Sequence, residues 1–154
     1  MKKIIISLFV FSLAIMLCAC GNAEDYNAKL TTIMNDEQQT AVQDVFSFDF
    51  EKAYIFDDPY ISGEGFAEKY NLDISINQVK SGASENIQRI VFVDKSGAFV
   101  YEFKCVASEV FIQEKGLVIY PETVIEKTSS SKEKLLTIAF KSSEYYGSNE
   151  LASY

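Results

Sequence analysis

The sequence contains no histidine, and this absence removes more chemistry than any other feature of its composition. Imidazole is the commonest general base of enzymes, the base of the Ser-His-Asp triads and a frequent zinc ligand. Without it, a cysteine nucleophile also lacks its usual activating partner. The composition therefore argues against the common triads, against thiol catalysis and against most transition-metal sites.

Glycine is scarce as well, with 7 residues in the chain, and their spacing does not form a phosphate-binding loop. Those in the central part, Gly63, Gly65, Gly82 and Gly97, fit neither of the glycine-rich nucleotide motifs. We therefore expect no nucleotide, no bound metal and no other cofactor. We expect a protein that is not an enzyme.

Cysteine occurs three times, at Cys18, Cys20 and Cys105, which leaves no disulfide framework once the N-terminal pair is removed or blocked, as argued below. Before Cys105, an aromatic residue stands at every second position: Phe99, Tyr101 and Phe103. This alternation places the thiol on the apolar face of a strand. We expect an inert core thiol, the alternative being an exposed thiol that pairs with another molecule.

Positive charge is in short supply, since 14 Lys and Arg face 22 Asp and Glu and give a formal net charge of −8. Removal of Lys2 and Lys3 with an N-terminal signal would bring this charge to −10. An acidic surface repels phosphate backbones, so nucleic acid is not an expected partner. The 48% hydrophobic content indicates one folded domain with a real core rather than a disordered stalk.

The first twenty residues have the pattern of a secretory signal: Lys2 and Lys3, then an uncharged run over 4–19, then Cys20. The segment Leu17-Cys18-Ala19-Cys20 resembles the lipobox of bacterial lipoproteins, in which an apolar residue and two smaller residues precede an invariant cysteine. A plain cleaved signal and an uncleaved membrane anchor are the alternatives. The uncharged run of 16 residues is short for an anchor, because a bilayer core takes about 20.

The lipobox resemblance implies cleavage after Ala19 and a fatty-acyl modification, such as palmitate, on the thiol of Cys20. Residues 1–19 would then be the signal peptide, and residues 20–34 the lipidated cysteine and a tether. The domain would be held by its lipid at the extracytoplasmic face of the cell membrane. In a cell with two membranes, Gly21 after the lipidated cysteine would resemble an outer-membrane sorting signal.

The remaining pattern predicts an α+β domain over 35–140, with a mostly antiparallel sheet of five to seven strands and one or two short helices. Two helices are expected, over 36–46 and over 61–70, the second capped by Ser62. A strand is expected over 52–56, and 74–76 is a further candidate strand. Three hairpins follow: 87–93 with 98–105, 110–112 with 117–120, and 123–126 with 135–140. Residues 141–154 are expected to be a tail.

The segment from Ser47 to Tyr60 is the most distinctive of the domain. It resembles a motif of small uncharacterised bacterial lipoproteins, and the matching residues are Phe48, Phe50, Lys52, Tyr54, Ile55, Phe56, Pro59 and Tyr60. Two positions depart from that motif. Glu51 stands where the motif usually has a different acid, and a phenylalanine stands where it often has tryptophan. The resemblance implies a similar order of elements up to about Phe140 and carries no known activity.

Candidate binding residues lie in this same segment: Tyr54, Phe56, Asp57, Asp58 and Tyr60. The aromatic side chains, with Tyr145 and Tyr146, would make a platform for a sugar or a protein, although their alternation also fits a core. Asp57 and Asp58, with Glu64, would hold Ca²⁺ or act as an acid pair, or they would simply end a strand.

Three functions remain open from the sequence. The first is a membrane-anchored, non-catalytic binding or interaction module with a possible protein partner in the cell envelope. The second is an inhibitor or immunity protein that masks a toxic or lytic enzyme. The third is a glycosidase that uses two carboxylates. It is the least favoured of the three, because no pair of carboxylates stands out in the sequence.

Overall fold

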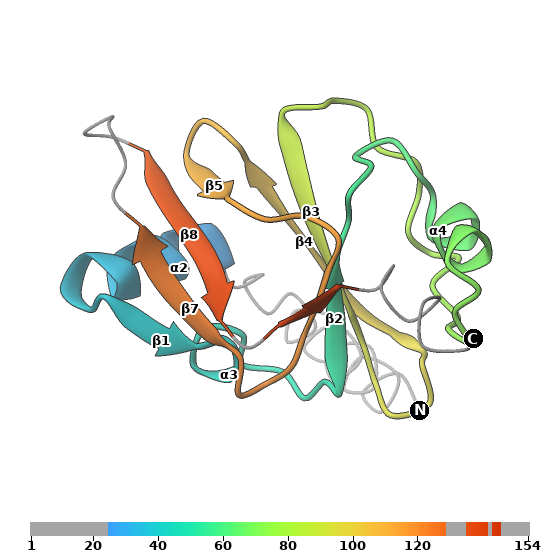
Figure 1. Cartoon of the computed structure of the whole chain (residues 1–154), viewed down its shortest axis with the longest axis horizontal. Helices are drawn as coiled ribbons and strands as arrows, with labels where there is room; N and C mark the ends of the chain where they lie inside the picture. The colour runs from blue at the N-terminus through green and yellow to red at the C-terminus, as the bar shows by residue number, and fades with distance from the viewer. Residues whose placement is uncertain (1–24, 129–134, 142, 146–154) are drawn as a thin grey trace, which may run out of the picture.

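A computed structural model describes residues 25–128, 135–141 and 143–145, which form an α+β fold (Figure 1). This part of the chain holds three helices and nine strands. In chain order they are α2 (Tyr26–Asp36), β1 (Gln39–Ala41), α3 (Val42–Val45), β2 (Lys52–Ile55), α4 (Gly63–Lys69), β3 (Ile87–Val93), β4 (Phe99–Val106), β5 (Val110–Ile112), β6 (Leu117–Ile119), β7 (Val124–Thr128), β8 (Leu136–Lys141) and β9 (Glu144–Tyr145).

The strands form two sheets rather than the single sheet that we expected. One has four strands in the order β1-β7-β8-β5, and the other has five in the order β4-β3-β2-β6-β9. Neighbouring strands are antiparallel except β5 and β8, which are parallel. The α+β class and the mostly antiparallel pairing are therefore confirmed, and the division into two sheets is the correction.

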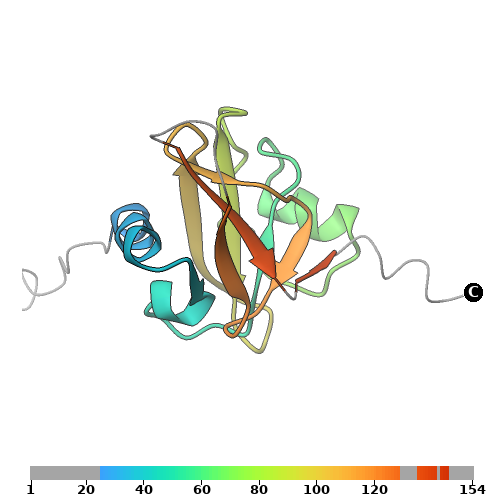
Figure 2. The same ribbon diagram turned by 60° about the vertical axis from the view of Figure 1, so that its left-hand side comes forward.

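The larger core joins the inner faces of the two sheets and the helices α2 and α3 (Figure 2). The four-stranded sheet contributes residues such as Ile125 and Phe140, and the five-stranded sheet contributes Phe92 and Phe103. At its centre Phe46 lies 4.7 Å from Phe92 and 5.2 Å from Phe103, measured between ring centroids. Such tilted and edge-to-face pairs stabilise a core beyond the area that they bury.

The five-stranded sheet buries its other face under α4. On β3, Ile90 and Phe92 point into the larger core, whereas Val91 and Val93 point toward α4 and pack in a second cluster with Phe66. Because successive side chains of a strand point to opposite faces, a strand buried on both sides reads as a continuous apolar run. β3 accordingly lies inside the sheet, between β4 and β2.

The helix expected over 36–46 is wrong as one element, because only Asp36 and the short α3 are helical there. The structure instead has α2 at Tyr26–Asp36, mostly within the expected tether, and its N-cap is Asp25, whose carboxylate accepts a hydrogen bond from the Ala28 amide at 3.1 Å. The following residues are β1, which pairs with β7, and the short α3. Pairing with a distant strand thus takes Gln39–Ala41 out of the helical pattern.

The first and third hairpins are confirmed as β3–β4 and β7–β8. Gly97 closes the first of them at a φ of 76°, in the left-handed region that glycine adopts readily. A register shift beside Val93 turns Phe99 toward the second cluster, so Phe99 does not share the face of Cys105, contrary to our expectation.

The second expected hairpin is wrong, although both of its segments are strands. β5 pairs with β8 in the four-stranded sheet, and β6 pairs with β2 in the five-stranded one. The expected tail contributes β9, which pairs with β6. Residues 74–76 form no strand and make one bridge, between Ser75 and Ala98. The strand β2 and the helix α4, capped by Ser62, are confirmed.

Candidate functional site

The aromatic residues predicted for a binding platform are separated by the fold. Tyr54 and Phe56 are 2% and 3% exposed and pack under α4, where the Phe56 ring stacks on Phe66 at 4.1 Å between centroids. Tyr60 is 50% exposed. Tyr145 contributes its backbone to β9, and Tyr146 lies outside the described residues. Of the five candidates, the aromatic ring that reaches solvent is therefore that of Tyr60.

The two predicted carboxylates hold local structure. Asp57 pairs with Lys69 at 3.3 Å and accepts a hydrogen bond from the hydroxyl of Tyr70. Partial burial, and then the bond to Asp57, raise the pKa of Tyr70 above its usual value. The Oδ1 of Asp58 accepts a hydrogen bond from the Tyr60 amide at 2.8 Å, which is an Asx turn. Within the described ranges, no group of three or more His, Cys, Asp or Glu could hold a metal ion.

A buried arginine, which the sequence analysis did not single out, organises this region. Arg89 lies on β3 and is 1% exposed. Its guanidinium donates hydrogen bonds to three backbone carbonyls: Pro59 at 3.1 Å, Ile61 at 2.7 Å and Lys80 at 2.7 Å. It thereby ties residues 57–62, called the Tyr60 loop below, to the segment around Lys80.

Arg89 also has a charged partner and an aromatic one. Its Nε lies 2.7 Å from Oε1 of Glu102, whose side chain is 12% exposed and also pairs with Lys104 at 3.1 Å. The guanidinium carbon lies 5.0 Å from the ring centroid of Phe56, as in a cation–π contact. The signal in the sequence was a lone cation inside the apolar run IQRIVFV, because such a charge on a doubly buried strand must find partners.

The backbone of the Tyr60 loop approaches its neighbours closely. A Cβ added at Gly82 would lie 1.8 Å from the carbonyl oxygen of Pro59, so this position has room for glycine only. The Gly63 amide donates to the Val79 carbonyl at 2.9 Å. The Tyr60 loop and Gly63 thus lie against residues 79–82, held there by the Gly63–Val79 backbone bond and by Arg89.

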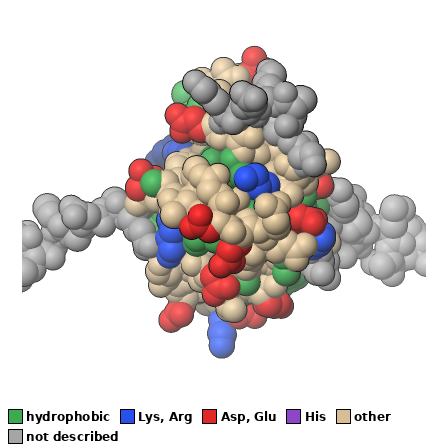
Figure 3. Space-filling model, turned by 90° about the vertical axis from the view of Figure 1, so that its left-hand side faces the viewer, with side chains coloured by type: hydrophobic (Ala, Val, Ile, Leu, Met, Phe, Trp, Pro, Cys, Tyr) green, Lys and Arg blue, Asp and Glu red, His purple; other side chains and the backbone are tan. Residues whose placement is uncertain are grey.

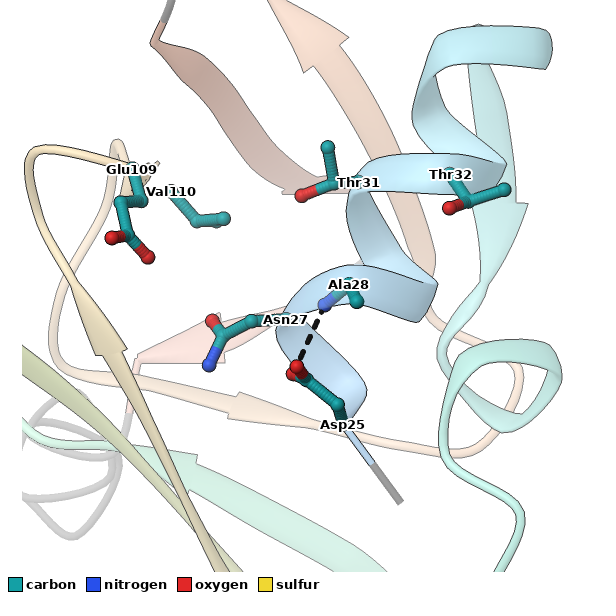
Figure 4. A pocket seen from close by; sticks show the side chains of 7 residues that line it. All are labelled: Asp25, Asn27, Ala28, Thr31, Thr32, Glu109 and Val110. Carbon is teal, nitrogen blue, oxygen red and sulfur yellow. Dashed lines mark hydrogen bonds between the residues drawn. The ribbon is translucent and has the colours of Figure 1, made fainter.

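A separate pocket of about 390 Å³ lies between α2 and the start of β5 (Figure 4). It is lined by polar and apolar groups of Asp25, Asn27, Ala28, Thr31, Thr32, Glu109 and Val110. Figure 4 shows Asn27 reaching across toward Glu109, while Asp25 is used as the cap of α2. Hydroxyl, amide and carboxylate groups of this kind suit a hydroxylated or cationic small group, but the pocket is open and its carboxylates form no close pair with a base.

The described cysteine is buried, which confirms the expected core thiol. Cys105 is free, 0% exposed, and its burial raises the pKa of the thiol to about 12. A thiol of this kind carries almost no thiolate at neutral pH. Cys20, the expected site of lipidation, lies outside the described residues.

Comparison with known proteins gives no relative: no family model, no curated protein and no solved structure matches this chain.

In the described ranges, no helix has both the length and the apolar character needed to cross a bilayer. Seen from the side of β1 and β7, acidic side chains are spread over the surface and hydrophobic ones appear only in small patches (Figure 3).

Proposed function

We propose that this chain is a lipoprotein of the cell envelope, anchored to the extracytoplasmic face of a membrane through a lipid on Cys20. The lipobox-like segment 17–20 supports the anchor. The helix α2 is capped at Asp25, so residues 21–25 separate Cys20 from the folded domain. Five residues reach at most about 18 Å even when fully extended, so the domain lies next to the membrane.

The chemistry of the anchor accounts for stable attachment. Each buried methylene contributes about 0.8 kcal/mol, and a single acyl chain binds only reversibly. A diacylglyceryl group places two chains on one sulfur, which holds a domain of this size on the membrane without a transmembrane helix. The acidic surface keeps the domain itself off anionic headgroups.

The role that the site supports best is a non-catalytic binding or interaction module. The observation that carries this role is the Tyr60 loop, in which an aromatic ring 50% exposed to solvent is held by bonds to a buried arginine. Tyrosine is among the residues that dominate binding energy at interfaces. A preformed loop loses little conformational entropy when it binds, so more of the contact energy appears as affinity.

The anchor is tested by matched cysteine variants produced in a bacterial cell. Cys20→Ala should abolish labelling by an alkyne analogue of palmitate. Cys18→Ala, two residues earlier, keeps the acceptor thiol and should label normally. If Cys20→Ala protein is still labelled, the anchor is assigned to the wrong residue.

One special form of binding module is favoured by the excess of acidic residues, with a net charge of −8. An inhibitor or immunity protein that covers a basic enzyme would use such a charge to attract its target quickly. An inhibitor should bring down one basic enzyme of the envelope in a fixed ratio and abolish its activity. A binding module of another kind would leave enzyme activities in the envelope unchanged.

A further inference from the structure

The position of Arg89 is unusual for a side chain that serves only stability. A buried ion pair gains little over well-packed apolar side chains, because removing both charges from water offsets much of their attraction. Val91 and Val93 occupy the same face of the same strand without any charge. An apolar side chain at position 89 could not bind the three carbonyl oxygens that Arg89 binds.

Two of those three bonds flank a single residue. Arg89 Nη1 donates to the carbonyls of Pro59 and Ile61, on either side of Tyr60. Asp58 accepts the amide of Tyr60 itself, so the backbone of this residue is held from both directions. The Tyr60 ring nonetheless points to solvent, 50% exposed. The fixed backbone therefore presents a tyrosine that is half open to solvent.

The chemistry beside the ring favours one kind of partner group. The Asp58 carboxylate is bonded to the Tyr60 amide at 2.8 Å and therefore lies next to that residue. A carboxylate offers about four lone-pair sites, so this bond leaves capacity for further donors. An aromatic face beside a carboxylate attracts ammonium or guanidinium groups, by cation–π attraction and by charge. The net charge of −8 also attracts cationic partners, and it does so over a longer range.

We infer that Arg89 is a positioning residue, which fixes the Tyr60 loop so that Tyr60 and Asp58 together bind a Lys or Arg side chain of a protein partner. This inference rests on the proposed binding role and adds the partner's chemistry to it. Asp57 does not take part, because Lys69 already pairs with it. The inference does not depend on the lipid anchor.

The positioning role is tested by amide hydrogen exchange with two variants that remove a cation from Glu102. Arg89→Met loses the carbonyl bonds as well as the charge, whereas Lys104→Met removes an exposed cation that binds the same carboxylate. Arg89→Met should speed exchange of the Tyr60 and Gly63 amides at least tenfold and leave β7 and β8 unchanged. Lys104→Met should change neither region.

A more conservative variant covers the case in which Arg89→Met does not fold. Arg89→Lys keeps the charge but has only three donors for the four bonds that Arg89 makes, and it loses the planar fork, so it should loosen the same two amides. If the Arg89 variants speed exchange uniformly through the domain, Arg89 is a stabilising residue only. If the Tyr60 and Gly63 amides exchange as in the wild type, the positioning role is wrong.

The cation-binding role is tested by nuclear magnetic resonance with a defined probe, a short peptide of alternating arginine and glycine. Its matched control replaces arginine by citrulline, which has nearly the same shape without the charge. The arginine peptide should shift resonances of the Tyr60 ring and of residues 58–61, and the citrulline peptide should not. Tyr60→Ala should abolish binding, and Arg89→Lys should weaken it at least fivefold, while Lys104→Met leaves it unchanged.

Two results would overturn the cation-binding site. Equal shifts with the citrulline peptide would show that charge is not recognised. Shifts spread over the acidic residues of the whole surface, and unchanged in Tyr60→Ala, would show general electrostatic attraction only. Failure of palmitate labelling at Cys20 would instead overturn the proposed location and leave this result intact.

Discussion

Two glycines of α4, two residues apart, should respond to alanine in opposite directions. A Cβ at Gly63 would lie 1.9 Å from the carbonyl oxygen of Ile76, whereas a Cβ at Gly65 would meet nothing closer than the Ser62 hydroxyl at 3.3 Å. Neither glycine has a positive φ, so backbone strain does not distinguish them. The difference between the two substitutions therefore isolates the close approach of α4 to the segment at Ile76.

The magnitudes follow from these contacts. Alanine at Gly63 must displace backbone by more than 1 Å, which costs about 1–3 kcal/mol for overpacking. The displacement also weakens the bond from the Gly63 amide to Val79, worth about 1 kcal/mol. Alanine at Gly65 should gain roughly 0.5 kcal/mol from reduced backbone entropy in the unfolded chain. The two variants should thus differ by about 3 kcal/mol in free energy of unfolding, or roughly 10 °C in melting temperature.

The assay is urea unfolding followed by circular dichroism, with wild type, Gly63→Ala and Gly65→Ala compared under the same conditions. Wild type should fall between the two variants, much closer to Gly65→Ala. The reasoning is refuted if Gly63→Ala is as stable as wild type, because α4 would then not lie against Ile76 as described. A large loss in Gly65→Ala would equally contradict the reasoning, which requires the Ser62 side chain, 3.3 Å from the added Cβ, to move aside by a few tenths of an ångström.

Two further predictions concern Asp94 and Cys105. Hydrogen bonds from the Ser96 hydroxyl, and then from the Ala98 amide, hold the pKa of Asp94 below its usual value of 3.8. The ionised carboxylate therefore stabilises the folded protein above that value, and this contribution is lost as the pH falls through the lower pKa of the folded state. Asp94→Asn should accordingly be less stable than wild type at about pH 7, with the difference shrinking below about pH 4, and a pH-independent difference in urea midpoints would contradict this. Because burial raises the pKa of Cys105 to about 12, iodoacetamide should leave the native protein unmodified and alkylate it once it is unfolded. Rapid alkylation of the native protein would mean that the thiol is not in the core.

Elements with local signals could be predicted from the sequence. The hairpin β3–β4 is specified by Asp94-Lys95-Ser96-Gly97 between two apolar runs, and α4 by the Ser62 cap. In both, the decisive groups lie within a few residues of each other. The same holds for β7 and β8, whose short connection makes them pair with each other.

Elements decided by distant partners could not be predicted. Gln39–Ala41 continues a helical apolar spacing, yet it pairs with β7, more than eighty residues later in the chain. The segments β5 and β6 look like one hairpin, but each pairs more favourably in a different sheet. By contrast, α2 was visible, since Asp25 can cap it and Tyr26, Leu30 and Met34 share one face. Its polar start resembled a tether, so the first helix was expected only from residue 36.

In the candidate site, too, features with local signals could be predicted and contacts between distant residues could not. Burial of Tyr54 and Phe56 agrees with the alternation that favoured a core, and the exposed ring of Tyr60 follows the turn after Pro59. Arg89 could not be connected to that turn, because thirty residues separate the guanidinium from the Pro59 carbonyl that it binds. A lone cation in an apolar strand signals a buried partner without saying which one.

The central claim is that this domain is carried to the envelope and held there by a lipid on one cysteine. Mass spectrometry of the protein extracted from membranes tests it most directly. The account predicts an N-terminal residue 20 whose mass is increased by a diacylglyceryl group, with residues 1–19 absent. An extracted protein that still begins at Met1, or that carries an unmodified Cys20, would contradict it.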